Sequence, residues 1–303
     1  MIESGPYANP RLDYDGQFAD ATRGRVVPDI TKIAWVGAMA IAAAVGCIAT
    51  FSLEGIAVFL VSTAVTLCLG HSLGMHRRFI HRSYDCPRWV ELTFVHLGTL
   101  VGLAGPLGML RTHDLRDWAQ RQPECHSYFA HREVWYRDLW WQLFCRIDMP
   151  APPTLRIEAA IAGDRSIAWM ERTWMWQQLP WAIVFWSIGG WTWVVWGIAL
   201  RVFVSIFGHW LIGYFAHRSG EQNWRVEGAA AQGFNIRWAS LLTMGECWHN
   251  NHHAYPGSAK LGLEPNQWDP GWWVLLALQR VGLASNFRLP ESLPDRDELI
   301  AVR

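Results

Sequence analysis

The sequence predicts an all-α integral membrane protein with four transmembrane helices, arranged as two hairpins, and a cytoplasmic helical cap. Of its 303 residues, 51% are hydrophobic, only 17% are charged, and 21 are tryptophan. Uncharged apolar runs of about 20 residues match the thickness of a bilayer core. Tryptophan suits the membrane–water interface, where its ring has one wet and one dry side. The net charge is zero, so no nucleic-acid partner is expected.

The first predicted hairpin follows a polar N-terminal segment. Residues 33–53 form an almost uncharged apolar run, and a second apolar run covers residues 56–73. Glu54 and Gly55 interrupt the hydrophobic pattern between them. We therefore expect two membrane-spanning helices joined by a short turn at these two residues.

The second predicted hairpin comprises the apolar runs 174–188 and 191–214, with Gly189 and Gly190 between them. Between the two hairpins, residues 87–110 are moderately apolar but carry charged residues. That mixture favours a helix lying in or against the membrane interface.

The distribution of arginine predicts the orientation. Neither hairpin tip contains Lys or Arg, whereas the N-terminal segment, the middle of the chain and the C-terminal third are rich in arginine. Positive charge collects on the cytoplasmic side, so both termini and the cap are expected there. We divide the chain into a polar cytoplasmic N-terminal segment (1–32), a membrane domain with its cap (33–285) and a C-terminal tail (286–303).

The strongest chemical signal is the run W-H-N-N-H-H over residues 248–253. In a helix, His249, His252 and His253 stand at positions i, i+3 and i+4 and share one face, so two or three imidazoles can point into one site. Imidazole suits iron, zinc and copper. The alternatives are a polar turn with incidental histidines and a zinc site, which typically uses four ligands.

A second signal is the motif G-x-H-R-x3-H-R-S-Y over residues 74–84. His76 and His81 are five residues apart, which is roughly 500° of α-helical rotation, so the two side chains are not expected to share a helix face. Either the pair reaches two different metals, or the helix ends between them.

These two motifs resemble the integral-membrane acyl-CoA desaturases. That family has four transmembrane helices and three histidine boxes (H-x4-H, H-x2-H-H and H-x2-H-H) that hold two irons at the cytoplasmic face, together with a further Asn and His near its last membrane helix. The resemblance covers roughly residues 33–285, and His217 falls where the additional histidine belongs.

The middle box departs from the family pattern. His113 is present, but Arg116 and Asp117 stand where histidines are expected, and Gly213 replaces the asparagine. Arginine cannot bind a cation, whereas Asp117 can. His209 lies one helical turn before Gly213 and could reach the place of the missing amide. We therefore expect an altered di-iron site with these metal ligands: His76, His81, His113, Asp117, His209, His217, His249, His252 and His253.

The resemblance implies that a double bond is introduced into a fatty acyl chain, bound to coenzyme A, to an acyl carrier or to a lipid, while dioxygen is reduced to water. Two irons would be the cofactor, and the site would face the cytoplasm. Electrons would come from a separate protein, such as a ferredoxin, a rubredoxin or a b-type cytochrome. The six cysteines form no C-x-x-C pair and no glycine-rich nucleotide loop is present, so no fused electron-transfer domain is evident.

Three other functions are consistent with the motifs. A histidine-rich hydroxylase of a lipid or hydrocarbon would share them. A metal-free relative would explain the altered middle box. A haem-binding electron-transfer protein would instead need histidine pairs within its apolar helices, whereas here the histidines lie near the helix ends.

Overall fold

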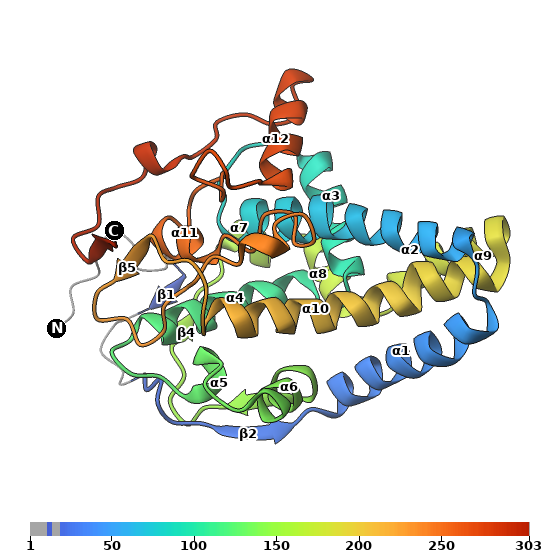
Figure 1. The fold of residues 1–303 in the computed structure, drawn as a ribbon, viewed down its shortest axis with the longest axis horizontal. Helices are drawn as coiled ribbons and strands as arrows, with labels where there is room; N and C mark the ends of the chain where they lie inside the picture. Colours follow the sequence, from blue (N-terminus) through green and yellow to red (C-terminus); the bar gives the residue numbers. More distant parts are fainter. Residues whose placement is uncertain (1–10, 14–18, 303) are drawn as a thin grey trace.

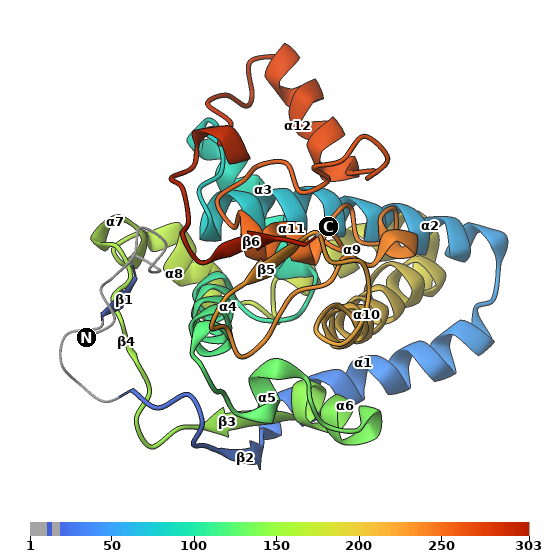
Figure 2. The same cartoon turned by 60° about the vertical axis from the view of Figure 1, so that its left-hand side comes forward.

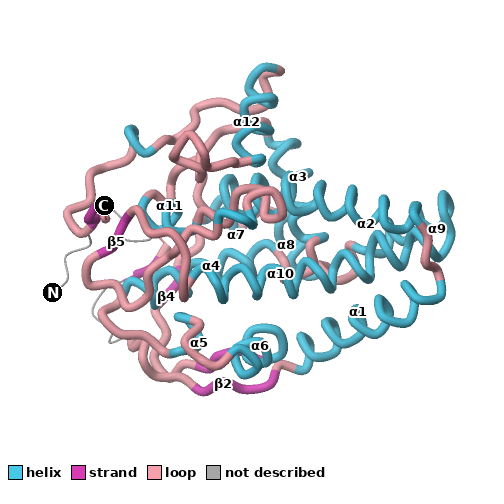
Figure 3. Tube along the Cα trace, in the orientation of Figure 1, coloured by secondary structure: helices cyan, strands magenta, loops and turns pink. Residues whose placement is uncertain are grey.

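The computed structural model describes residues 11–13 and 19–302, and this part of the chain is mostly helical (Figures 1 and 3). Strands occur only as short antiparallel pairs, without a closed sheet, in the described residues. The pairs are β1 (Leu12–Asp13) with β4 (Thr154–Leu155), β2 (Arg25–Pro28) with β3 (Cys145–Asp148), and β5 (Trp224–Val226) with β6 (Leu299–Ala301).

Three continuous helical stretches are long and apolar enough to cross a membrane: Ile30–Ala49, Leu53–Ile80 and Gln178–Ala216. The first is α1 (Ile30–Ala49). The second joins α2 (Leu53–Val65) to the π-helix η1 (Thr66–Ile80), and the third joins α9 (Gln178–Val194) through the π-helix η2 (Val195–Leu200) to α10 (Arg201–Ala216). In Figure 1 these stretches extend to the right, away from the cap.

The turn predicted between the third and fourth apolar runs is visible as a break inside α9. Gly189 and Gly190 have non-helical backbone angles, and φ of Gly190 is +61°. Glycine reaches positive φ at little cost because it lacks a Cβ. At the other tip, the side chain of Ser52 accepts a hydrogen bond from the amide of Gly55 and so caps α2. The break at Gly189 and Gly190 is therefore where the sequence predicts it, whereas the turn of the first hairpin lies at residues 50–52, and Glu54 and Gly55 belong to the first turn of α2.

Close backbone contact joins η1 to α3 (Arg88–Leu100). A Cβ added to Gly74 would lie 2.5 Å from the backbone of Phe94, and one added to Gly70 would lie 2.4 Å from the backbone at Gly98. The absence of side chains at these positions lets the two helices approach closely. This close contact fixes the position of η1 along α3.

The remaining helices form the cap, which lies at the left and centre of Figure 1. Figure 2 shows the pairs β1–β4 and β2–β3 at its edge and the pair β5–β6 beside α11. The single helix expected over residues 87–110 is instead two helices, since Gly102 has φ of +87° and Pro106 begins a new helix. The cap helices are α3, α4 (Pro106–Arg121), α5 (Ser127–Ala130), α6 (Trp135–Phe144), α7 (Ala159–Ala162), α8 (Arg165–Arg172), η3 (Arg237–Ala239), α11 (His249–Ala254), α12 (Pro270–Arg280) and η4 (Pro290–Ser292).

Two strand pairs tie the ends of the chain to the cap. β2 belongs to the predicted N-terminal segment and pairs with β3, which follows α6. β6 belongs to the predicted C-terminal tail and pairs with β5, shortly before α11. Both ends therefore pack against the segments that carry the histidines.

Candidate metal centre

The first histidine pair lies at the end of the π-helix η1. The amide of His81 donates to the carbonyl oxygen of His76 at 3.0 Å, five residues back, and the two rings are 4.8 Å apart. A helix with i→i+5 hydrogen bonds turns more slowly than an α-helix, and such helices occur mostly at functional sites. Helix η1 ends at Ile80, between the two histidines, as one of the two alternatives left open by their spacing predicts, and both rings contribute to one group.

A first histidine group consists of His76, His81, His113 and His252. One ring nitrogen from each lies within 4.8 Å of those of the other three, and the Nε2 atoms of His81 and His113 are 3.2 Å apart. The group draws on three elements, because His113 comes from α4 and His252 from α11.

A second histidine group consists of His217, His249 and His253. The Nε2 atom of His249 lies 3.1 Å from that of His217 and 3.1 Å from that of His253. His217 follows the last residue of α10, and its Nδ1 lies 2.8 Å from the carbonyl oxygen of Gly213. That contact leaves Nε2 of His217 directed toward the group.

Helix α11 contributes to both groups. His249 and His253 are one turn apart, with rings 4.5 Å apart, and belong to the second group. His252 turns the other way, and its ring lies 4.5 Å from that of His76 in the first group. The H-x2-H-H spacing thus divides three imidazoles between two adjacent sites.

Carboxylates stand behind the first group. Glu246 lies 2.5 Å from Nδ1 of His76, and Asp114 lies 3.5 Å from Nδ1 of His113. Burial opposes ionisation of Glu246, but His76 and Arg77 outweigh it and hold its pKa well below the usual value. A carboxylate on the far nitrogen orients an imidazole and strengthens it as a ligand.

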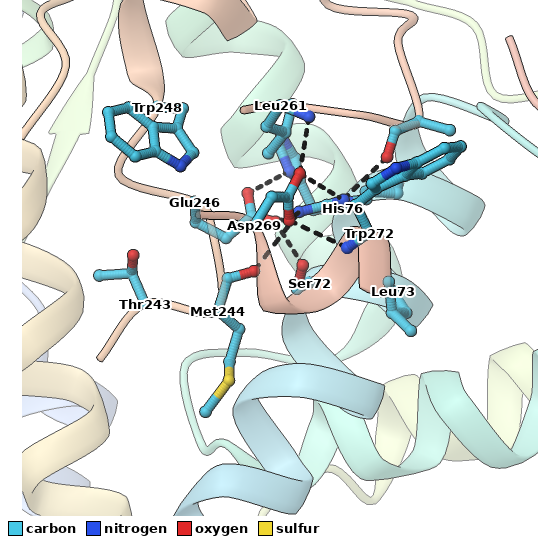
Figure 4. A network of polar contacts seen from close by, with 12 residues as sticks. Ser72, Leu73, His76, Thr243, Met244, Glu246, Trp248, Leu261, Asp269 and Trp272 are labelled. Carbon is cyan, nitrogen blue, oxygen red and sulfur yellow. Dashed lines mark hydrogen bonds and ion pairs between the residues drawn. The ribbon is translucent and has the colours of Figure 1, made fainter. Parts of the chain in front are cut away.

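A buried ion pair fixes η1 to the C-terminal part of the cap, as Figure 4 shows around Asp269. Arg77 donates to Asp269 at 2.8 Å and to the carbonyl oxygen of Ala259 at 2.8 Å. The other carboxylate oxygen of Asp269 accepts from the amide of Leu261 at 2.8 Å. Ser72 adds a 2.5 Å hydrogen bond to Glu246. This network sets the position of His76 relative to α11.

Two of the predicted ligands lie outside both groups. A carboxylate oxygen of Asp117 is 3.9 Å from Nδ1 of His113, behind the first group, and 3.8 Å from Arg121. The ring of His209 is 5.1 Å from that of His71, an edge-to-face contact between two membrane helices. The other seven predicted ligands are all members of one group or the other.

The place beside Gly213 is taken by His131, a histidine that follows the middle box in the sequence but is not among the expected metal ligands. A Cβ on Gly213 would lie 3.4 Å from Nε2 of His131, and the His131 ring stacks on that of His217 with centroids 5.2 Å apart. Nδ1 of His131 lies 2.9 Å from Asp138. Burial and then Arg116 lower the pKa of His131 to about 4. The only hint in the sequence is the missing side chain at position 213, since nothing local links it to a residue 82 positions earlier.

The geometry fits nitrogen-bound metal ions. A neutral imidazole nitrogen is either a donor or an acceptor, so three Nε2 atoms facing one another cannot all be satisfied by hydrogen bonds among themselves. Ligand nitrogens at right angles around a cation, each about 2.1 Å from it, lie about 3.0 Å apart, close to the 3.1 Å separations in the second group. Burial lowers the pKa of His252 and of His253, which favours the neutral form that binds a metal.

Comparison with known proteins supports the same assignment. The profile of the fatty acid desaturase family matches residues 54–260. An sn-1 stearoyl-lipid 9-desaturase of Anabaena variabilis is 31% identical over 245 residues, covering 80% of this chain and 86% of the relative. An acyl-CoA 5-desaturase of Anemone leveillei is 27% identical over 248 residues, covering 82% of this chain and 76% of the relative.

A third relative, an sn-1 stearoyl-lipid 9-desaturase of Synechocystis, is 29% identical over 242 residues, 79% of this chain and 74% of the relative. The matched region contains both histidine motifs and the helices that carry them. The chain belongs to the fatty acid desaturase family and is an oxygen-dependent fatty acyl desaturase.

Proposed function

We propose that this protein introduces a double bond into a fatty acyl chain at a centre of two irons held by the two histidine groups. The observation that carries the proposal is the meeting of seven imidazoles in two adjacent groups at the ends of the apolar helices. The relatives of highest identity among those compared act on lipid-bound chains, so we propose a membrane lipid as the acyl carrier, with coenzyme A as the alternative.

The seven histidines would hold the irons, His76, His81, His113 and His252 one of them and His217, His249 and His253 the other. When bound, two irons supply an oxidant strong enough to remove hydrogen from an unactivated C–H bond, which no side chain can do. The protein residues orient and protect this centre. In this proposal Asp117 and His209 lie beside the iron centre and are not iron ligands.

The chain's own groups prepare the site for these ions. Buried imidazoles remain neutral and offer their lone pairs without releasing a proton. Glu246 and Asp114 hold the far nitrogens of His76 and His113, which fixes the two rings. Helix α11 holds its three imidazoles in one rigid turn, so that the two groups keep their spacing.

The apolar helices position the substrate. His76 lies near the end of the candidate span Leu53–Ile80, and His217 directly follows the span Gln178–Ala216. An acyl chain entering from the bilayer between these helices would therefore pass the histidines. Such a chain lacks polar groups along its length, so its depth would decide which carbon reaches the centre.

We further propose four membrane crossings, with the break at Gly189 and Gly190 separating the third from the fourth. The tips lack Lys and Arg while the cap is rich in arginine, which places both termini, the cap and the metal centre on the cytoplasmic side. In this arrangement residues 33–285 form the membrane domain, and segments 1–32 and 286–303 flank it.

Electrons would come from a separate protein, such as a ferredoxin, a rubredoxin or a b-type cytochrome, docking on the cytoplasmic cap. The six cysteines are scattered and free in the structure. They therefore offer no cluster of thiolates for an iron–sulfur centre.

The test is product analysis in a host of defined lipid composition that expresses the full chain. We expect new monounsaturated acyl chains, two mass units lighter than the saturated parent, and their loss in the His249→Ala variant. A product 16 mass units heavier would assign the protein to the hydroxylases. Normal membrane expression with two irons per chain but no change in any lipid would contradict the proposed reaction. Feeding labelled acyl-CoA to purified membranes would separate the two carriers.

A further inference from the structure

The two histidine groups have different charged surroundings. Behind the first group, Glu246 contacts Nδ1 of His76, and Asp114 and Asp117 lie 3.5 Å and 3.9 Å from Nδ1 of His113. These carboxylates offset the charge of a cation bound there. In the part of the chain that the structure describes, no carboxylate lies within 4.0 Å of a ring nitrogen of the second group.

A buried guanidinium lies beside the second group instead. Arg116 contacts Nε2 of His131 and donates to the side-chain oxygen of Gln142 at 2.7 Å. Among the described residues its hydrogen-bond partners are neutral, and no carboxylate lies within ion-pair distance. Asp138 contacts the opposite nitrogen of His131, 2.9 Å away. The imidazole ring of His131 therefore stands between Arg116 and that carboxylate.

Arg116 reaches the second group through His131. The His131 ring that it contacts is stacked on His217, with ring centroids 5.2 Å apart. A metal ion here would add a second positive charge to a site that has three neutral imidazoles and a guanidinium. An anion bound at this site would offset the two positive charges and so lower the free energy of the site.

We propose that Arg116 makes the second histidine group a binding site for one small anion. The inference rests on the proposed function, because it concerns the metal ion that His217, His249 and His253 would hold. Dioxygen gains negative charge as it takes up electrons in the family's reaction, and the guanidinium, a planar donor with five N–H groups, can stabilise that charge. Arg116 is thus a positioning residue for the oxygen side of the reaction, in a place where the family pattern has a metal ligand.

Azide titration of the purified full-length protein, loaded with cobalt(II) and followed by visible absorption, tests this proposal. Metal content is measured first in the wild type and in every variant. In Arg116→Met, which removes the charge but keeps the length, we expect azide affinity to fall about tenfold or more, the worth of one charge-assisted hydrogen bond. Metal content should remain at the wild-type level.

Two further variants separate charge from other effects. Arg116→Lys keeps the charge but loses the planar fork, so its azide affinity should fall less than that of Arg116→Met. Arg111→Met removes an exposed arginine from the same helix and should leave azide affinity unchanged. A wild type that binds no metal would contradict the proposed function itself.

The anion site is overturned by any of three results obtained with a metal-loaded wild type. The first is azide affinity in Arg116→Met within about twofold of the wild type. The second is a loss in Arg116→Lys as large as that expected for Met, which would show that charge is not the cause. The third is loss of a metal ion in Arg116→Met, which would make the arginine part of metal retention instead.

Discussion

At the scale of single residues, the ligand properties of each imidazole depend on the partner of the ring nitrogen that faces away from its group. His76 has a carboxylate on its far nitrogen, His217 has a backbone carbonyl, and the ring stacked on His217 has an arginine. Partners on the far nitrogen fix the orientation and basicity of a histidine. The two groups should therefore differ in metal affinity, although both present the same ligand atoms.

Glu246→Gln tests the role of the carboxylate. The variant keeps the size of the side chain but removes the charge beside His76 and leaves one acceptor oxygen where Glu246 has two, one for His76 and one for Ser72. We expect metal affinity at the first group to fall about 10-fold to 100-fold, measured by competition with a chelator. Glu264→Gln, an exposed site in the same part of the chain, is the control. Equal metal retention in both variants would show that Glu246 is only a structural acid.

At the scale of secondary-structure elements, the form of the helices decides where histidines point. The π-helix η1 brings His76 and His81 together, and the short helix α11 separates His252 from His249 and His253. The position of η1 depends in turn on its close contact with α3, which is allowed by glycine at Gly70 and Gly74. Packing between these two helices is thus a condition for the first group.

Gly74→Ala should disturb that packing. Its Cβ would lie 2.5 Å from the backbone of Phe94, and a rigid backbone cannot move aside without displacing the helix. We expect a loss of about 1–3 kcal/mol in the free energy of unfolding, seen as a lower midpoint in thermal unfolding, with reduced metal content. Gly37→Ala in α1 meets nothing within 4 Å and should not lower the midpoint, since alanine in a helix interior is more favourable than glycine by about 0.5–1 kcal/mol. Equal midpoints for the two variants would contradict this account.

At the scale of the whole molecule, long-range contacts join the membrane helices to the cap. Arg77 on η1 and Asp269 before α12 are separated by 192 residues, yet pair at 2.8 Å with side chains almost fully buried. The strand pairs β2–β3 and β5–β6 tie both ends of the described chain to the same cap. These contacts keep segments that are distant in sequence around one site.

Asp269→Asn should destabilise the protein strongly, because it leaves the Arg77 charge without its main partner in the interior. Loss of one member of a buried pair costs about 3–5 kcal/mol, and we expect much less folded, metal-loaded protein after detergent extraction. Asp85→Asn removes a largely exposed carboxylate that lies 3.2 Å from Arg78. An exposed pair contributes about 0–1 kcal/mol, so this control should extract normally. Similar yields of both variants would rule out the structural role.

The four-crossing topology gives a prediction for each loop. A reporter that is active only outside the cytoplasm should be active when fused after Gly190 and inactive when fused after Val302. The reason is that the Gly189–Gly190 turn carries no positive charge, whereas the cap is rich in arginine. Activity at both fusion sites would contradict the proposed fourth crossing, and inactivity at both would contradict the third.

The sequence by itself determined the apolar helices, the break at Gly189–Gly190, the approximate place of the first turn and the seven histidines of the two groups, because hydropathy, turn chemistry and ligand type are local properties. The tertiary structure alone decided how those histidines divide, since the π-form of η1 and the position of α11 depend on packing against other elements. It also placed His131 beside Gly213 and Arg116 beside His131. Contacts of this kind join side chains far apart in the chain, and no local pattern encodes them.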